Sequence, residues 1–209
     1  MAQQVFPTKS NLMATKRSLA LAEQGYDLMD RKRNILVREM MQLIDRAAGI
    51  QDRISAAYAE AYDALQKANI MLGSVGEYAG GVPGEYGLRL STRSVMGVEL
   101  PTLSLQTTSP LGIYYDLEST NGTLDVAYLK FNEVKTLTVE LTEVETSVIR
   151  LAEAIQKTQK RANALGNVQI PQMQKTIKSI DEVLGERERE EFSRLKVIKA
   201  QKEKQAEEA

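Results

Sequence analysis

The sequence predicts a mostly α protein: a long antiparallel two-helix coiled coil with a small β-hairpin and glycine-rich insert at its closed end. Two observations indicate this fold. Two separate stretches carry apolar residues at alternating spacings of three and four, the pattern of a supercoiled helix that needs a partner helix. The stretch between them is rich in glycine and then alternates apolar with polar residues, which favours short strands. The predicted divisions are residues 1–72 for the first helix, 73–122 for the insert and 123–209 for the second helix.

The first helix is predicted from one unbroken apolar stripe, which only Thr15 and Arg33 interrupt with polar groups. At 1.5 Å per residue, a helix of some 60 residues is roughly 90 Å long, which predicts a rod rather than a compact domain. Gly25 and Gly49 lie inside it and cost about 1 kcal/mol each relative to alanine, which a long seam can absorb. The stripe consists of Leu12, Leu19, Ala22, Tyr26, Met29, Leu36, Met40, Leu43, Ala47, Ile50, Ile54, Ala57, Ala61, Ala64, Ala68 and Met71.

The insert begins with residues 73–87, GSVGEYAGGVPGEYG, where the density of glycine predicts that no helix forms. Alternating apolar positions then predict short strands in a hairpin or a small meander, at Leu88, Leu90, Val98, Leu100, Leu103 and Leu105. Pro101 and Pro110 favour edge strands, because proline cannot donate a ladder hydrogen bond. Residues 113–117 read as a further strand or a connector.

The second helix is expected after Asn121-Gly122, with Thr123 as its N-cap. Its seam consists of Val134, Leu137, Leu141, Val144, Val148, Leu151, Ile155, Ala162 and Leu165, with Thr158 as its one polar member. Gly166, Asn167 and Pro171 disturb the pattern, and Pro171 is expected to bend the helix because it removes one backbone hydrogen bond. The seam resumes in a shifted phase at Met173, Ile177, Ile180 and Leu184. This helix is the longer of the two and is expected to project past the first.

The composition excludes several classes of function. The chain has no cysteine and no histidine, which removes disulfides, thiol nucleophiles, the usual zinc sites and histidine acid–base catalysis. Carboxylate or lysine chemistry stays open in principle, but a rod offers no cleft to desolvate such groups. The glycine-rich stretch lacks the GK[ST] ending of a phosphate loop. We therefore expect no catalytic residue, no metal and no cofactor.

The net charge of −1 gives no reason to expect nucleic-acid binding. The first ten residues contain no apolar run typical of a signal peptide, and no stretch of about 18 apolar residues could span a membrane. We therefore expect a cytoplasmic protein without direct membrane insertion.

Basic residues gather at one level of the predicted rod. Arg33 lies in the seam itself, where it can snorkel and fix the register. The group can be an ordinary solvated face, or a docking band for an acidic surface that surrounds the rod. We call it the basic collar; an antiparallel pairing brings together its members Arg31, Lys32, Arg33, Arg38, Lys157, Lys160 and Arg161.

Aromatic residues gather at the closed end, beside a seam of small alanines. Part of this surface must pack under the insert, and that packing alone is a sufficient explanation for it. The remainder is a candidate partner-binding surface. We call it the apolar patch; its members are Tyr58, Tyr62, Leu65, Tyr128 and Phe131.

Several strings make the chain resemble the D subunits of the V-type and archaeal-type rotary ATPases. They are PTKSNL at 7–12, LALAEQGYDLMDRKRNILVREM at 19–40, VMGVELP at 95–101, QKRANAL at 159–165, IPQMQKTIKSI at 170–180 and EREREEFSRLKVIK at 186–199. The resemblance implies the central rotor shaft of such a complex, which transmits torque while other subunits catalyse ATP hydrolysis or synthesis. It implies that the tip with both termini enters the hexameric head of A and B subunits. It further implies that the closed end meets the F subunit of the rotor and the subunit that couples to the membrane ring.

Other functions share parts of this pattern. A non-rotary coiled-coil adaptor or tether would have the seam without the family strings. The F-type gamma shaft carries a large α/β domain between its helices, and the insert of this chain is too short for one. An enzyme would require turnover by the isolated chain.

Overall fold

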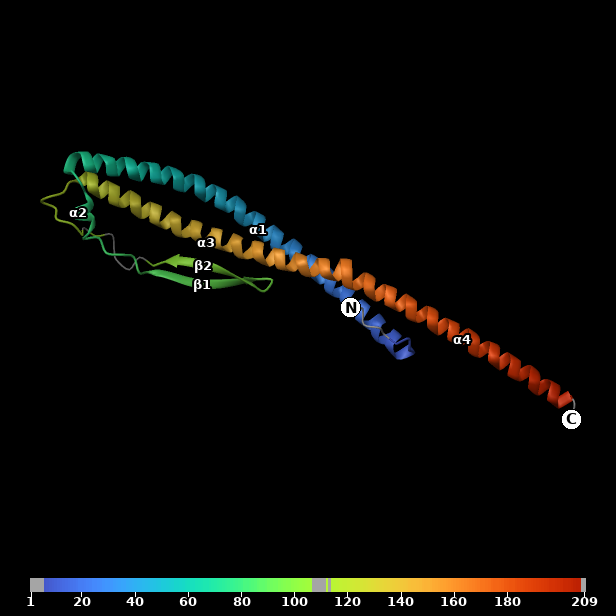
Figure 1. The fold of residues 1–209 in the computed structure, drawn as a ribbon. Helices are drawn as coiled ribbons and strands as arrows, with labels where there is room; N and C mark the ends of the chain where they lie inside the picture. Colours follow the sequence, from blue (N-terminus) through green and yellow to red (C-terminus); the bar gives the residue numbers. More distant parts are fainter. Residues whose placement is uncertain (1–5, 107–111, 113, 208–209) are drawn as a thin grey trace. The chain divides into compact units, whose positions relative to one another are not determined.

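The computed structural model describes residues 6–106, 112 and 114–207. Along the chain lie α1 (Lys9–Leu72), α2 (Gly76–Ala79), β1 (Leu88–Val95), β2 (Val98–Leu105), α3 (Gly122–Ala164), the π-helix η1 (Leu165–Gln169) and α4 (Ile170–Glu207) (Figure 1). The predicted class, mostly α with a small hairpin, is confirmed. The chain forms two compact units, and α1 and α3 contribute to both. We call Arg33–Gln156 the hairpin unit, and Met1–Lys32 with Lys157–Ala209 the terminal unit.

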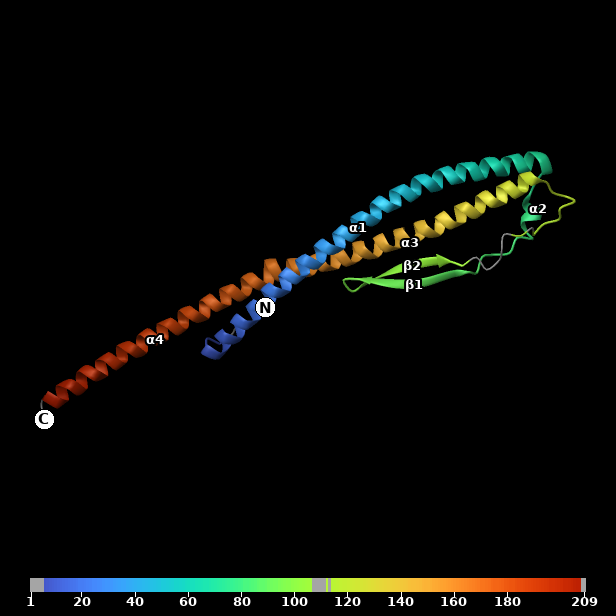
Figure 2. The same cartoon turned by 180° about the vertical axis from the view of Figure 1, so that it is seen from behind.

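In the hairpin unit, α1 and α3 pack against each other in antiparallel directions, side by side in both views of the ribbon (Figures 1 and 2). One cluster joins Leu36, Leu43 and Ile50 to Val144 and Leu151, and the next joins Ile54, Ala57 and Ala61 to Val134 and Leu137. Every buried residue of α1 lies on the predicted stripe: Leu36, Leu43, Ile50, Ile54, Ala57, Ala61, Ala64 and Ala68. The seam predicted from periodicity is therefore the core of this unit.

The β1–β2 hairpin packs against the two helices. Leu100 of β2 is completely buried and belongs to the same cluster as Leu36 and Val144. An ion pair of 2.7 Å joins Arg93 of β1 to Glu39 of α1. The hairpin thus forms part of the core rather than a free appendage (Figure 2).

The insert differs from its prediction in one respect. The expectation of no helix in residues 73–87 was wrong, because one helical turn, α2, forms at Gly76–Ala79. Of the alternatives left open, the described residues form the hairpin and not the meander, and residues 114–117 form a connector and not a strand. Residue 113 and Pro110 lie outside the described residues, so their predictions stay open.

The N-cap of α3 also differs from its prediction. The helix begins at Gly122, and the side-chain oxygen of Asn121 accepts a hydrogen bond of 3.1 Å from the backbone N–H of Thr123. Asn121 therefore caps the helix, and the assignment of Thr123 as the cap was wrong. Asparagine is among the strongest N-cap residues, since its side-chain oxygen can satisfy an otherwise unpaired N–H of the first turn.

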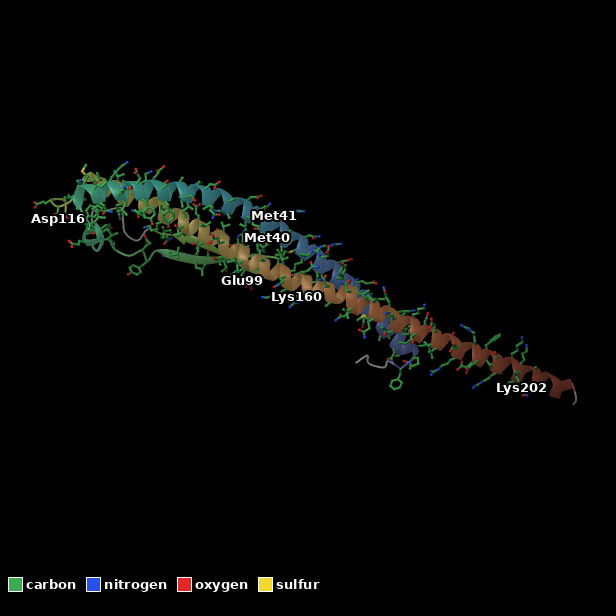
Figure 3. All side chains as sticks on the ribbon, turned by 45° about the horizontal axis from the view of Figure 1, so that its top comes forward. Met40, Met41, Glu99, Asp116, Lys160 and Lys202 are labelled. Atoms are coloured by element: carbon green, nitrogen blue, oxygen red, sulfur yellow. The ribbon has the colours of Figure 1, made fainter. Side chains whose placement is uncertain are left out.

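In the terminal unit, the beginning of α1 runs antiparallel to α4. Lys9 forms an ion pair of 2.8 Å with Glu188, and Arg187 donates a hydrogen bond of 3.4 Å to the carbonyl of Pro7. Since α4 continues to Glu207, the second helix extends past the first, as predicted. Residues 186–202 are all exposed, and their side chains stand out along α4 as far as Lys202 (Figure 3).

The predicted disturbance near Gly166 is a π turn. The N–H of Ile170 donates to the carbonyl of Leu165, five residues earlier instead of four. Gly166 lies against Tyr26 of α1, and a Cβ at this position would come within 2.8 Å of the tyrosine ring. Pro171 follows η1 within the same uninterrupted helical run, so the π turn lies before the proline rather than at it. A bend caused by Pro171 itself stays a prediction. Beyond Pro171, Met173, Ile177 and Leu184 are half-buried and Ile180 is buried, which confirms the shifted seam.

None of the helices in the described part of the chain combines the length and the apolar character needed to cross a membrane.

Candidate partner-binding surfaces

The basic collar is divided between the two units. In the terminal unit, Gly166 lies opposite Tyr26 on the antiparallel helix. This alignment places Arg31 opposite Arg161. Arg31, Lys157, Lys160 and Arg161 are exposed and Lys32 is half-buried; Lys160 is labelled in Figure 3. The terminal unit therefore carries a group of cations on both of its helices at one level.

The two remaining collar residues belong to the hairpin unit. Arg38 is exposed. Arg33 is half-buried, and its guanidinium donates a hydrogen bond of 3.3 Å to the side-chain oxygen of Asn34. That Arg33 snorkels out of the seam and fixes its register stays a prediction. Whether the two groups of cations act together stays a prediction.

The apolar patch is a contiguous aromatic surface. The rings of Tyr58 and Tyr62 stack with centroids 5.9 Å apart, and Tyr62 meets Phe131 of α3 edge-to-face at 5.7 Å. Tyr62 remains 58% exposed, although it lies between two other rings. Because α1 and α3 both contribute rings, the patch bridges the two helices beside the alanine seam.

The other patch residues face the insert. Leu65, Tyr128 and Phe131 line an apolar cavity of about 220 Å³. Val75 and Tyr78 from the region of α2 and Tyr115 from the connector line it as well. Packing under the insert therefore accounts for Leu65, Tyr128 and Phe131. Tyr58 and Tyr62 stay exposed, and partner binding by these two rings stays a prediction.

The contribution of Tyr115 to this cavity was not predicted. Its hydroxyl donates a short hydrogen bond to the carboxylate of Asp125 in the first turn of α3, and its ring meets Tyr128 edge-to-face at 6.5 Å. The sequence signal was the gathering of aromatics in the insert, which does not say which ring reaches α3. Burial of the ring, then the hydrogen bond to Asp125 and its negative charge, raise the pKa of Tyr115 to about 12.

We expect this tyrosine to make the stability of the hairpin unit depend on alkaline pH. The neutral form is favoured by folding, so its contribution is fully present below the ordinary pKa of 10.0 and is lost as pH rises toward about 12. The free-energy difference between wild type and Tyr115→Phe should therefore be constant below about pH 10 and shrink above it. Tyrosinate absorbance of the folded protein should lose its last-titrating component in Tyr115→Phe. A variant with an unchanged titration curve would contradict the assignment.

No group of three or more acidic side chains among the described residues is arranged to hold a metal ion. The features that the described surface does carry are two groups of cations, one in each unit, and an aromatic patch.

Comparison with known proteins assigns the chain to a family. Residues 11–200 match the family model of the ATP synthase D subunit. The V-type ATP synthase D subunit of Thermotoga neapolitana is 45% identical over 197 residues, which cover 93% of this chain and 97% of the relative. The A-type ATP synthase D subunit of Pyrococcus furiosus is 39% identical over 200 residues, covering 94% of each chain. That of Pyrococcus abyssi is 38% identical over 200 residues, covering 93% of this chain and 92% of the relative.

Proposed function

The chain belongs to the family of ATP synthase D subunits, and from this premise we propose how it works as the central stalk of an A/V-type ATPase. It carries torque between the hexamer that hydrolyses or makes ATP and the membrane ring that moves ions. The observation that carries this proposal is the seam of the hairpin unit. There two long helices pack against each other through buried, regularly spaced residues.

Torque transmission requires that one helix cannot turn independently of the other. A single α-helix twists and bends easily, whereas interlocked side chains resist torsion because each must leave its position in the packed seam. The alanines Ala57, Ala61, Ala64 and Ala68 are all buried and let the helices approach closely. Leu36 and Leu151, both completely buried, fill the seam at the level of the hairpin.

The terminal unit is the part that enters the hexameric head of A and B subunits in this proposal. Its apolar surface is poorly covered: Phe192 is 70% exposed and Leu195 is 63% exposed, on a stretch of α4 beyond its contact with the start of α1. Exposed apolar groups of this size favour a protein environment around them. The collar would face the bore of the head, where screened charge contacts guide the shaft without holding it at one angle.

The closed end is the part that meets the smaller F subunit of the rotor and the subunit coupled to the membrane ring. The exposed rings of Tyr58 and Tyr62 support this assignment, since aromatic residues dominate the central contacts of protein interfaces. The stalk itself is non-catalytic in this proposal, and it lies peripheral to the membrane through its complex.

The comparisons give no support to the alternative of a non-rotary adaptor. Affinity purification of the tagged chain under native conditions, followed by mass spectrometry, tests the two directly. A rotor shaft should co-purify with the catalytic hexamer and with an F-like subunit, and the isolated chain should not turn over ATP. Recovery of other partners without the hexamer would overturn the proposal.

We expect charge reversal of the collar to lower the affinity of the hexameric head for the shaft. Four charge contacts at the surface of the shaft, at about 0.5 kcal/mol each, amount to roughly 30-fold in affinity. The variant replaces Arg31, Lys32, Arg33 and Arg38 by glutamate and is tested for ATP-driven rotation and ion pumping in the reconstituted complex. Its thermal melting should stay close to wild type.

The matched control reverses Arg46 and Arg53, which are exposed on α1 outside the collar. This control should assemble and pump normally. Full coupling in the collar variant would show that these cations are only a solvated surface.

A further inference from the structure

The two edges of the β1–β2 hairpin can be distinguished from the register. The turn at Met96-Gly97 has positive φ at both residues, 50° and 76°, and closes the pair Val95–Val98. The carbonyl of Gly87 accepts a hydrogen bond of 2.9 Å from the N–H of Gln106. Alternate pairs therefore bond across the hairpin, and the pairs between them point their backbone groups outward. The outward pairs are Leu88–Leu105, Leu90–Leu103, Thr92–Pro101 and Ser94–Glu99.

The outer edge of β2 is closed by side chains of α3. The N–H of Leu103 donates a hydrogen bond of 2.7 Å to the carboxylate of Glu143. The carbonyl of Glu99 accepts one of 3.0 Å from Arg150. Pro101, between them, has no N–H to satisfy. Along this edge, the N–H of Leu103 and the carbonyl of Glu99 are therefore already hydrogen-bonded, and Pro101 between them has no N–H to offer an added strand.

The outer edge of β1 is open. Leu88, Leu90, Thr92 and Ser94 are exposed, and within the described part of the chain their outward backbone groups meet neither α3 nor another strand. The strand has eight residues in continuous register, without a bulge, a proline or a lysine, and its two charged side chains, Arg89 and Arg93, both lie on the face that carries Leu100. Proteins normally protect an edge by such devices, because an unprotected edge invites another strand.

The side chains beside this edge indicate what kind of strand would fit. On one face, the leucine pairs Leu88–Leu105 and Leu90–Leu103 form an apolar surface, of which Leu88 is 51% and Leu90 is 66% exposed. On the other face, Arg89 is exposed, while Arg93 pairs with Glu39. An added strand therefore gains most from apolar side chains beside the leucines and an acidic side chain beside Arg89.

Resting on the proposed function, we propose that the open edge of β1 binds an extended segment of another polypeptide of the complex, which adds a third strand to the hairpin. The segment alternates apolar residues with polar ones and places a carboxylate beside Arg89. Backbone hydrogen bonds to Leu88, Leu90, Thr92 and Ser94 hold it, and the alternating side chains select it. A second copy of this chain fits less well, because antiparallel pairing over the whole of 88–94 would set Arg89 against Arg93.

Residue-resolved hydrogen exchange on the full chain, alone and in the purified native complex, tests this proposal. The amides of Leu90, Thr92 and Ser94 should exchange at least about tenfold more slowly in the complex, as expected for newly paired strand amides. The amide of Leu103 should change little, because it is already bonded to Glu143. Unchanged exchange at β1 in a complex that contains the hexamer would overturn strand addition alone. A chain that co-purifies with nothing would overturn the proposed function and this inference with it.

Two variants at one position separate the backbone from the side chain. Thr92→Pro removes an outward N–H and leaves the β1–β2 bonds intact, as Pro101 does directly opposite in β2. Thr92→Ala changes only the side chain. Thr92→Pro should abolish the slowed exchange and weaken assembly about tenfold, whereas Thr92→Ala should not. Retained slow exchange at Leu103 verifies that the hairpin of Thr92→Pro is folded. Equal behaviour of the two variants would overturn the proposal.

The acidic partner residue can be captured chemically. Arg89→Lys supplies an amine that a carbodiimide couples to a carboxylate in contact with it, while the wild-type arginine does not react in this way. The cross-linked peptide, identified by mass spectrometry, should come from another subunit. A cross-link to a second copy, or slowed exchange that depends on the concentration of the isolated chain, would overturn the choice of partner.

Discussion

Insertion of one alanine after Ile50 is expected to lower the stability of the hairpin unit by at least about 3–5 kcal/mol. One extra residue turns the rest of α1 by about 100° relative to the residues before it. Ile54, Ala61, Ala64 and Ala68 then leave the seam. Their places are taken by the residues that precede them, and those include four charged ones: Arg53, Glu60, Asp63 and Lys67. Burying unpaired charges costs several kcal/mol each, comparable with the whole stability of a domain.

The helix can avoid this burial only by forming a wide turn like η1, which gives up regular hydrogen bonds. Circular dichroism melting and urea unfolding measure the loss, and co-purification with the hexamer reports assembly. The matched control inserts alanine after Ala200, in the exposed part of α4, and should stay within about 0.5 kcal/mol of wild type. A variant at Ile50 that melts like wild type would show that the α1–α3 seam does not hold this unit.

Substitution of Leu100 by alanine is expected to cost about 2–5 kcal/mol, the range for truncating a fully buried leucine. Leu100 of the hairpin is completely buried, and it packs in one cluster with Leu36 of α1 and Val144 of α3. The hairpin should then detach more often from the helices, so the amides of β2 should exchange faster. Urea unfolding and hydrogen exchange provide the two measurements.

Leu90→Ala is the control, because Leu90 lies on the opposite face of the same hairpin and is 66% exposed. This substitution should change stability by less than about 0.5 kcal/mol. If both variants lose the same amount, the difference in burial between the two faces does not govern stability, and the docked position of the hairpin is contradicted.

The difference between these two leucines shows what the sequence could and could not predict. The seam was predictable, because a helix repeats its buried positions at a spacing that can be read from neighbouring residues. Strand alternation likewise marked Leu90 and Leu100, but it could not tell which face would be buried. That choice depends on Glu39, Glu143 and Arg150, which are distant in the sequence and fix the hairpin against α1 and α3.

The candidate surfaces were predictable to different extents. The apolar patch was predicted from the gathering of aromatic residues at the closed end, and the structure joins Tyr62 to Phe131. The contribution of Tyr115 was missed, because a connector without periodicity gives no indication of where its side chains lie. The collar was predicted from the alignment of residues across the two antiparallel helices. Within the terminal unit, the contact of Tyr26 with Gly166 supports that alignment. The charge-reversal variant tests whether the collar residues of the terminal unit act together with Arg33 and Arg38 of the hairpin unit.

The π turn at Leu165–Gln169 gives the second helix a place where its length can change by one residue. A deletion inside this segment would convert the wide turn into an ordinary α turn and leave the residues from Met173 onward facing as they do now. The same deletion near Ile50 would misalign everything after it. Relatives that differ by one residue in the second helix should therefore carry the gap here, and an evolutionary record of length variation would concentrate at this turn.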